Sequence, residues 1–133
     1  MRAVLDASAA LSFVLHDERD ERAEFLLDAM RRTSAVVPAI WPAEVANGLM
    51  SARKRQRIDR RGVLRAVQLL GNLDIEVDRV DCSIARIITL AEDHHLTAYD
   101  AVYLELALRE DIRLASNDRD LMAAAKSARI ALM

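Results

Sequence analysis

The sequence predicts a three-layer α/β domain in which helices cover both faces of a central, mostly parallel sheet of about four to five short strands. Short apolar segments typical of buried strands alternate along the chain with longer segments whose apolar residues recur at helical spacing. The chain has 133 residues, of which 53% are hydrophobic, enough for a single domain over 1–133 with its own core. It has only three glycines and two prolines, which favours a helix-rich protein with about seven helices.

The N-terminal part is predicted to begin with a short buried strand over 2–6, which ends in an acid. Ser8 is expected to cap a helix over 9–15, because a serine hydroxyl accepts a free backbone N–H at a helix start. The charged segment 16–21 reads as a turn into a second helix. The apolar residues of that helix follow the spacing i, i+3, i+4, i+7, and they are Ala23, Leu26, Leu27 and Met30.

The next segment predicts a second strand over 34–38, closed by a proline that cannot donate to a sheet. Pro42 suits the first turn of a helix, which we place over 42–55. Asp59 is expected to cap the following helix, which ends near Gly71. The buried side of that helix is expected to consist of Val63, Ala66, Val67 and Leu70.

The second half continues the alternation. A strand with one wet face is predicted over 75–80, and a helix with its apolar side at Ile84, Ile87, Ile88 and Ala91 is predicted after Ser83. A further helix begins near Asp100, with its apolar stripe at Tyr103, Leu104 and Ala107. Three more elements follow, a strand over 112–116, a short helix through Ala125 and an edge strand over 128–132.

Four acidic residues share one position in this pattern, at the end of a strand or the start of a helix. They are Asp6, Glu44, Asp100 and Asp118. Because ligand sites in open α/β sheets lie outside the carboxyl ends of the strands, we expect these carboxylates to meet there. Each one alone is equally well explained as a helix-cap or first-turn acid, but four together repel one another unless a cation lies between them. Oxygen ligands without Cys or His suit Mg²⁺ or Mn²⁺.

Four segments in this order give the chain a resemblance to a known family. They are Val4–Ser8, Pro42–Asn47, Leu96–Tyr103 and Leu114–Leu121. Each is weak alone, but as an ordered set spanning nearly the whole chain they resemble PIN-domain proteins. Among these, they are most similar to the VapC-type toxin ribonucleases of bacterial toxin–antitoxin pairs.

The resemblance implies a Mg²⁺- or Mn²⁺-dependent endoribonuclease with a PIN-like fold. It implies that the metal and the catalysis belong to Asp6, Glu44, Asp100 and Asp118. The family usually has Thr two residues before its fourth acid, where this chain has Ser116, which keeps a hydroxyl. Asp120 is the alternative fourth acid, but the register of the motif favours Asp118, and Asp120 is then expected, like Ser116, to support the metal ligands or to cap a helix. Ser8 and Thr97 are either helix caps or side chains that hold metal-bound water or phosphate.

A cationic run places seven Lys and Arg side chains between residues 53 and 65, although the net charge of the chain is −2. Three uses stay open: contact with the RNA backbone, docking of a cognate antitoxin, and a solvated helix end. The candidate contact residues are Arg53, Lys54, Arg55, Arg57, Arg60 and Arg61.

Two other function classes are open at this stage. A phosphatase or phosphotransferase with Asp6 as nucleophile is disfavoured, because Ser8 stands where such phosphatases usually carry a second acid. A catalytically inactive PIN-like module that binds RNA or protein remains the alternative. The single cysteine, Cys82, permits no internal disulfide, and the chain shows no signal peptide, so we expect a cytoplasmic protein. A homodimer is expected from the resemblance only.

Overall fold

The computed structural model describes residues 1–133 as a four-stranded parallel sheet between two groups of helices. The strands are β1 (Arg2–Leu5), β2 (Ser34–Val37), β3 (Ile75–Val77) and β4 (Arg113–Ala115), and their order in the sheet is β3-β2-β1-β4. Every neighbouring pair is parallel. The predicted α/β fold with a parallel sheet and seven helices is confirmed.

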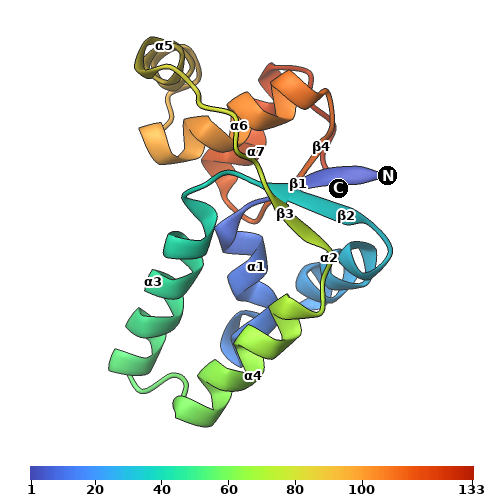
Figure 1. Ribbon diagram of the computed structural model, residues 1–133, viewed down its shortest axis with the longest axis vertical. Coiled ribbons are helices and arrows are strands. Elements are labelled where there is room, and N and C mark those ends of the chain that lie inside the picture. Colours follow the sequence, from blue (N-terminus) through green and yellow to red (C-terminus); the bar gives the residue numbers. More distant parts are fainter.

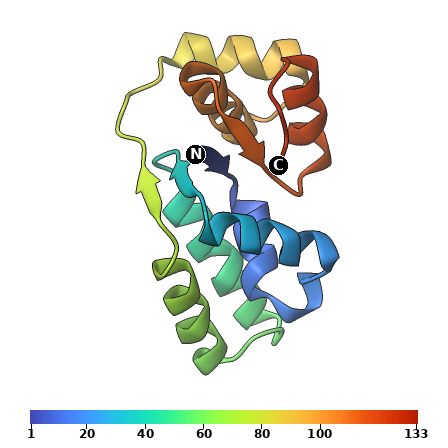
Figure 2. The same ribbon diagram turned by 90° about the vertical axis from the view of Figure 1, so that its right-hand side faces the viewer.

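Helices α1 to α4 lie on one side of the sheet and α5 to α7 on the other (Figures 1 and 2). On the first side, a short 3-10 helix, His16–Glu18, follows α1. The helices are α1 (Ala7–Val14), α2 (Glu21–Arg31), α3 (Trp41–Lys54), α4 (Arg60–Gly71), α5 (Ile84–His94), α6 (Ala98–Glu110) and α7 (Arg119–Ser127). None of them combines the length and the apolar character needed to cross a bilayer.

The core forms where the strands pack against α1, α2 and α6. β1 is the central strand, and Ala3, Val4 and Leu5 are fully buried, as expected for a parallel strand with helices over both faces. Glycine at position 48 lets α3 approach α1 closely, because a side-chain carbon there would overlap Leu11. This close approach brings the N-terminal halves of α1 and α3 together.

Two predicted helix starts differ in outcome. Asp59 caps α4 as predicted, since its Oδ1 accepts the backbone N–H of Gly62 at 2.7 Å. The prediction that Ser8 caps the first helix is wrong. Helix α1 begins at Ala7, and its N-cap is Asp6, whose carboxylate accepts the N–H of Ala9. A carboxyl oxygen of Asp6, two residues earlier, satisfies the same helix end, which leaves the Ser8 hydroxyl free for other partners.

Several predicted strands are longer than the observed ones. The strand predicted over 75–80 ends at Val77, and Val80 is exposed. The edge strand predicted over 128–132 is reduced to one parallel bridge between Leu132 and Leu114. Arg129 has a positive φ of 63°, so the chain turns sharply after α7 and reaches the sheet edge only at its end. The segment 16–21, predicted as a turn, contains the short 3-10 helix.

The apolar stripe predicted for α5 is largely exposed rather than buried. Ile84 is 77% and Ile88 is 50% exposed, and Leu90 is the one buried residue of the helix. The physical reason is position, because α5 lies at the outside of the molecule with α6 as its main packing partner (Figures 1 and 2). Helical periodicity is correct here, but it does not say which face meets the core.

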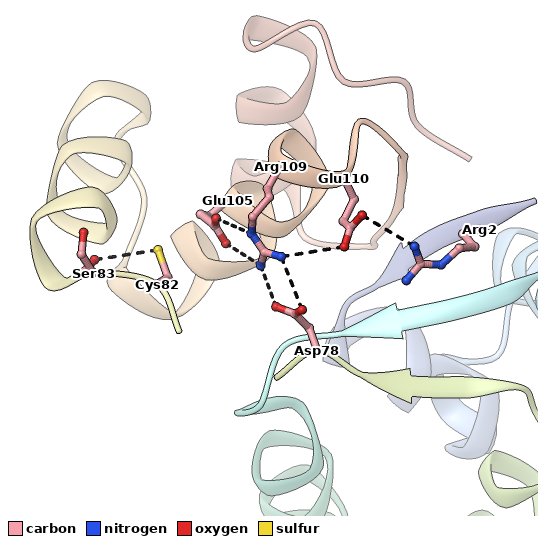
Figure 3. Close-up of polar contacts among 7 residues, drawn as sticks. All are labelled: Arg2, Asp78, Cys82, Ser83, Glu105, Arg109 and Glu110. Carbon is pink, nitrogen blue, oxygen red and sulfur yellow. Dashed lines mark hydrogen bonds and ion pairs between the residues drawn. The ribbon is translucent and has the colours of Figure 1, made fainter. Parts of the chain in front are cut away.

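A cluster of ion pairs fixes the segment after β3 to α6 (Figure 3). Its centre is Arg109, whose Nη2 donates to Asp78 Oδ2 at 2.6 Å and whose Nε donates to Glu105 Oε1 at 2.9 Å. Glu110 lies 3.8 Å from Arg109 and links it to Arg2 of β1, at 3.6 Å. The acids raise the pKa of the Arg109 guanidinium, Glu105 most strongly and then Asp78, so that side chain is firmly cationic. The cluster therefore holds α6 in place relative to the sheet.

Candidate active site

The four acids singled out in the sequence line one cavity of about 320 Å³. It lies where the sheet reverses its winding, because β2 and β3 lie on one side of β1 and β4 lies on the other. Such a switch point between two strands opens a crevice at their carboxyl ends, where ligands of open α/β sheets bind. The lining residues are Asp6, Ala7, Ser8, Leu11, Glu44, Asn47, Gly48, Asp100, Tyr103 and Asp118, and none of them is a lysine or an arginine.

Asp6 is the most deeply placed of these acids, with 3% of its surface exposed. Its Oδ1 accepts hydrogen bonds from Ser8 Oγ at 2.7 Å and from the N–H of Ala9 at 2.9 Å, and its Oδ2 accepts one from Ser116 Oγ at 2.6 Å. Burial raises the pKa of Asp6, and the hydrogen bonds only partly offset that effect. The carboxylate is therefore held in one orientation.

Glu44 lies in the first turn of α3, and its partner comes from α6. Tyr103 donates its phenolic O–H to Glu44 Oε1 at 2.5 Å. Burial and the Glu44 charge raise the pKa of Tyr103, so the phenol keeps its proton and remains a donor. This contact joins residues 59 positions apart, and it leaves Glu44 Oε2 without a hydrogen bond.

Asp100 has the clearest electrostatic signature. Its pKa is raised to about 6, first by burial and then by the negative charges of Asp118, Asp6, Glu44 and Asp120. Thr97 is the N-cap of α6, since its Oγ1 accepts the N–H of Asp100 at 3.2 Å. Asp100 therefore experiences all the other acids at once, and no cationic side chain compensates them.

Asp118 caps α7 through its Oδ1, which accepts the N–H of Leu121 at 2.9 Å. Its own N–H donates to Ser116 Oγ at 2.9 Å, so Ser116 connects Asp118 to Asp6. Asp120 is exposed in the first turn of α7 and does not line the cavity, although its charge reaches Asp100. Of the two candidate fourth acids, Asp118 is the one on the cavity wall.

Ser8 bridges the two loops of the site rather than capping a helix. Its hydroxyl donates to Asp6 and accepts the N–H of Asn117 at 3.1 Å. Arg22 of α2 holds the same loop from behind, and it was absent from the residues that the sequence singled out. Its guanidinium donates to the carbonyl of Ser116 at 2.8 Å and to Asn117 Oδ1 at 3.1 Å. Because these partners lie 94 and 95 residues away, no local pattern indicates the role of Arg22.

The candidate contact residues of the cationic run divide into two groups. Arg53, Arg57 and Arg60 line a second cavity at the turn between α3 and α4, together with Arg65. Lys54, Arg55 and Arg61 are exposed but do not line it. The cationic run is thus continuous in the sequence, but only some of its side chains line this second cavity.

The acidic cavity fits a divalent cation by its chemistry. Burial and then the other carboxylates raise the pKa of Asp100, and a doubly charged ion would remove the repulsion between the carboxylates. Nowhere in the chain do three or more His, Cys, Asp or Glu side chains stand close enough to ligate one ion together. A Mg²⁺ ion in this cavity would therefore take one or two carboxylates directly and keep several waters. Asp6, Glu44, Asp100 and Asp118 are the residues that would hold it, directly or through those waters.

A four-stranded parallel sheet with an acidic cavity at its switch point defines a class of α/β proteins suited to metal-dependent chemistry on phosphates. The family model for the PIN domain matches residues 3–127, so this chain belongs to the PIN-domain family. PIN domains are generally metal-dependent nucleases.

Solved structures agree on the fold. The crystal structure of PAE2754 from Pyrobaculum aerophilum superposes with a TM-score of 0.70 at 20% sequence identity. The match covers 93% of this chain and 84% of that one, which shows a shared fold over nearly the full length. A search of curated proteins gives no match to this sequence.

Proposed function

We propose that this protein is a Mg²⁺- or Mn²⁺-dependent endoribonuclease and the toxin of a toxin–antitoxin pair. The observation that carries the enzymatic part is the cavity lined by Asp6, Glu44, Asp100 and Asp118 without a lysine or arginine. Membership of the PIN family supports nuclease chemistry, and the resemblance of the four motifs to VapC-type toxins supports RNA as the substrate.

Bound Mg²⁺ or Mn²⁺ would supply a water of lowered pKa for in-line attack on the phosphodiester and would stabilise charge on the scissile phosphate. The contribution of the chain is to hold the carboxylates ready. Ser8 and Ser116 fix both oxygens of Asp6, and Tyr103 fixes one oxygen of Glu44. Asp100, whose pKa is raised to about 6, must lose its proton before it binds a cation. The products would carry 3′-hydroxyl and 5′-phosphate ends.

A phosphatase with Asp6 as covalent nucleophile has less support. Ser8 stands where such phosphatases usually carry a second acid, and the Asp6 side chain is almost fully buried. A nucleophile must be able to approach the phosphorus atom.

The test is cleavage of mixed single-stranded RNA by purified protein free of antitoxin, with Mg²⁺ or Mn²⁺, and with EDTA as control. Asp100→Asn should lower the rate at least about a hundredfold, since it removes a carboxylate that would hold the metal, and loss even of an outer partner of a metal ligand costs about 10–100-fold. Asp93→Asn, the same change on an exposed acid of α5, is the matched control and should leave the rate unchanged. Cleavage that survives in EDTA or in Asp100→Asn contradicts the metal mechanism. A wild type that binds RNA but cuts none is a binding module.

The partners follow from the same proposal. A cognate antitoxin would neutralise the protein, so expression alone should slow growth of the host and co-expression of a neighbouring small reading frame should restore it. A homodimer is proposed as well, with support from the exposed apolar side chains Ile84, Ile88 and Tyr99 on and beside α5. Sedimentation velocity gives the mass that checks it. A cytoplasmic location stays a prediction.

A further inference from the structure

The second cavity, which we call the arginine cavity, lies around the turn between α3 and α4 and has a volume of about 750 Å³. Five arginines line it from four segments of the chain: Arg19, Arg53, Arg57, Arg60 and Arg65. Of the apolar residues on its wall, Phe13 and Ala66 are buried, whereas Val14, Ile58 and Leu69 are partly exposed, so a ligand meets apolar surface as well as guanidinium groups.

These five arginines are not equivalent. Arg57 is neutralised by Asp17 and Glu18, each at 2.7 Å, and Arg19 lies 2.6 Å from Glu24. The side chains of Arg53, Arg60 and Arg65 form no hydrogen bond or ion pair with the protein. All three of these side chains are exposed to solvent. The cavity thus presents three guanidinium groups with unused donors.

Part of the remaining wall also favours an anion. Arg60 and Gly62 on the wall belong to the first turn of α4, a helix of 12 residues whose N-terminus carries partial positive charge. Asp59, the N-cap of α4, also lines the cavity, so one carboxylate stands beside the arginines, and its Oδ1 accepts the N–H of Gly62. Guanidinium groups bind phosphate oxygens through two parallel N–H donors, which suits a phosphodiester backbone. Of the two aromatic rings on the wall, Phe13 is fully buried, whereas His16 is exposed and open for a base to stack on.

The acidic cavity and the arginine cavity are connected by the same two helices. Ser8 and Leu11 of α1 line the acidic cavity, whereas Val14, at the end of α1, lines the arginine cavity. On α3, Glu44 lines the acidic cavity and Arg53 lines the arginine cavity. The two residues are nine positions apart, which is about 13 Å along the helix axis. With a rise of about 3.4 Å per stacked nucleotide, a stacked strand covers this distance with about four nucleotides, and a more extended strand covers it with fewer.

We propose that Arg53, Arg60 and Arg65 form a subsite for backbone phosphates of the RNA strand, up to about four nucleotides from the bond that is cut. This inference rests on the proposed ribonuclease function, and it names the part of the substrate that the acidic cavity does not hold. The three arginines contact the backbone and not the bases, and the exposed ring of His16 is the one aromatic group of the wall that is open to a base. An acidic protein segment is the competing occupant, and the test below separates the two.

The chain supplies a matched pair of triple variants for this test. One is Arg53→Ala with Arg60→Ala and Arg65→Ala, and the other is Lys54→Ala with Arg55→Ala and Arg61→Ala. Both remove three positive charges from the same exposed segment, but only the first removes the three unpaired guanidinium groups of the arginine cavity. Circular dichroism checks that both fold. Binding of fluorescein-labelled single-stranded RNA is measured by anisotropy in the non-cleaving Asp100→Asn background over a series of salt concentrations.

The cavity variant should bind RNA about ten- to a hundredfold more weakly and lose about two from the slope of log K against log salt, which is the value for three phosphate contacts on a single strand. The control variant should change affinity less than about threefold, because its charges act only through the screened general field. Equal weakening by both triples overturns the proposal in favour of unspecific attraction. Unchanged RNA binding by the cavity variant also overturns it, and loss of antitoxin binding in that case identifies the cavity as a protein site.

Cleavage provides the second readout. In the wild-type background the cavity triple should raise KM for a 20-nucleotide RNA and leave kcat and the cleavage of a dinucleotide unchanged, because the single phosphodiester of a dinucleotide is held at the acidic cavity. Loss of dinucleotide cleavage would mean that the arginines act at the acidic cavity instead. If the wild type cuts no RNA at all, the proposed function fails, whereas the anisotropy result still decides whether the arginine cavity binds phosphates.

Discussion

Glu105 and Asp6 are both acids with little exposure, 8% and 3%, yet their surroundings differ in kind. Glu105 faces Arg109, which also binds Asp78, so the acids around it are balanced by a guanidinium of the same chain (Figure 3). Asp6 faces hydroxyls and other carboxylates, and no cationic side chain lines its cavity. Paired acids hold a fold together, whereas acids that share a cavity without a counter-charge are suited to take a cation from solution.

Arg109→Ala tests the cluster in which the acids are paired with a guanidinium. The variant leaves Glu105 and Asp78 without their partner, and it should lower the free energy of unfolding by about 2 kcal/mol, or Tm by about 5–10 °C. Thermal unfolding in EDTA measures the change. Arg113→Ala, at an exposed arginine of β4 that forms no ion pair, is the control and should change Tm little. An unaffected Tm in Arg109→Ala would mean that the cluster is only a surface contact.

Substitution of Arg22 tests how the loop of Asp118, one of the acids without a cationic partner, is held in place. Arg22→Lys keeps the charge but lacks the fork that reaches both Ser116 and Asn117, so the loop that carries Asp118 should loosen. We expect the Mn²⁺ concentration for half-maximal cleavage to rise about tenfold, with kcat at saturating metal largely kept. Arg31→Lys on the same helix, which pairs only with exposed Asp28, should behave like the wild type. A lowered kcat with unchanged metal dependence would contradict a positioning role.

The repulsion between the carboxylates of the acidic cavity is tested in the absence of metal. Asp100→Asn removes one of the crowded charges, and at pH 7.5 in EDTA it should raise the free energy of unfolding by about 1 kcal/mol. A pKa of about 6 corresponds to a larger change in the free energy of unfolding, but solvent screens this partly exposed side chain and makes the change smaller. Differential scanning calorimetry with and without Mn²⁺ measures this. In Mn²⁺ the order should reverse, since only the wild type gains stability from the ion.

The pH dependence sharpens the same point. The folded pKa of Asp100 lies above its ordinary value of 3.8, so the stability that this group contributes is fully present below about pH 4 and is lost as pH rises through about 6. The advantage of Asp100→Asn in EDTA should therefore be small at pH 4 and grow to its full size by pH 7.5. Cleavage by the wild type should rise over the same interval, because a cation binds the ionised carboxylate. A difference in Tm that is independent of pH would show that Asp100 is not the titrating group.

The sequence indicated the shared location of the four acids better than it indicated which helix faces are buried. Asp6, Glu44, Asp100 and Asp118 lie at strand ends and helix starts, and the parallel order of the strands is sufficient to bring such positions to one edge. The same kind of spacing was misleading for α5, where Ile84 and Ile88 repeat with helical period and yet face solvent. It also placed a cap at Ser8, although Asp6 performs that role.

What the sequence by itself determined is therefore local: the alternation of strands and helices, the cap of α4 at Asp59, and the position of each acid within its own element. Backbone hydrogen bonding and side-chain periodicity act over a few residues, so a pattern of that length can reveal them. Only the tertiary structure decided that Tyr103 holds Glu44, that Arg22 holds the loop of Asp118, and which arginines share a cavity. Those contacts join residues far apart in the chain, and their partners are selected by the packing of whole elements against one another.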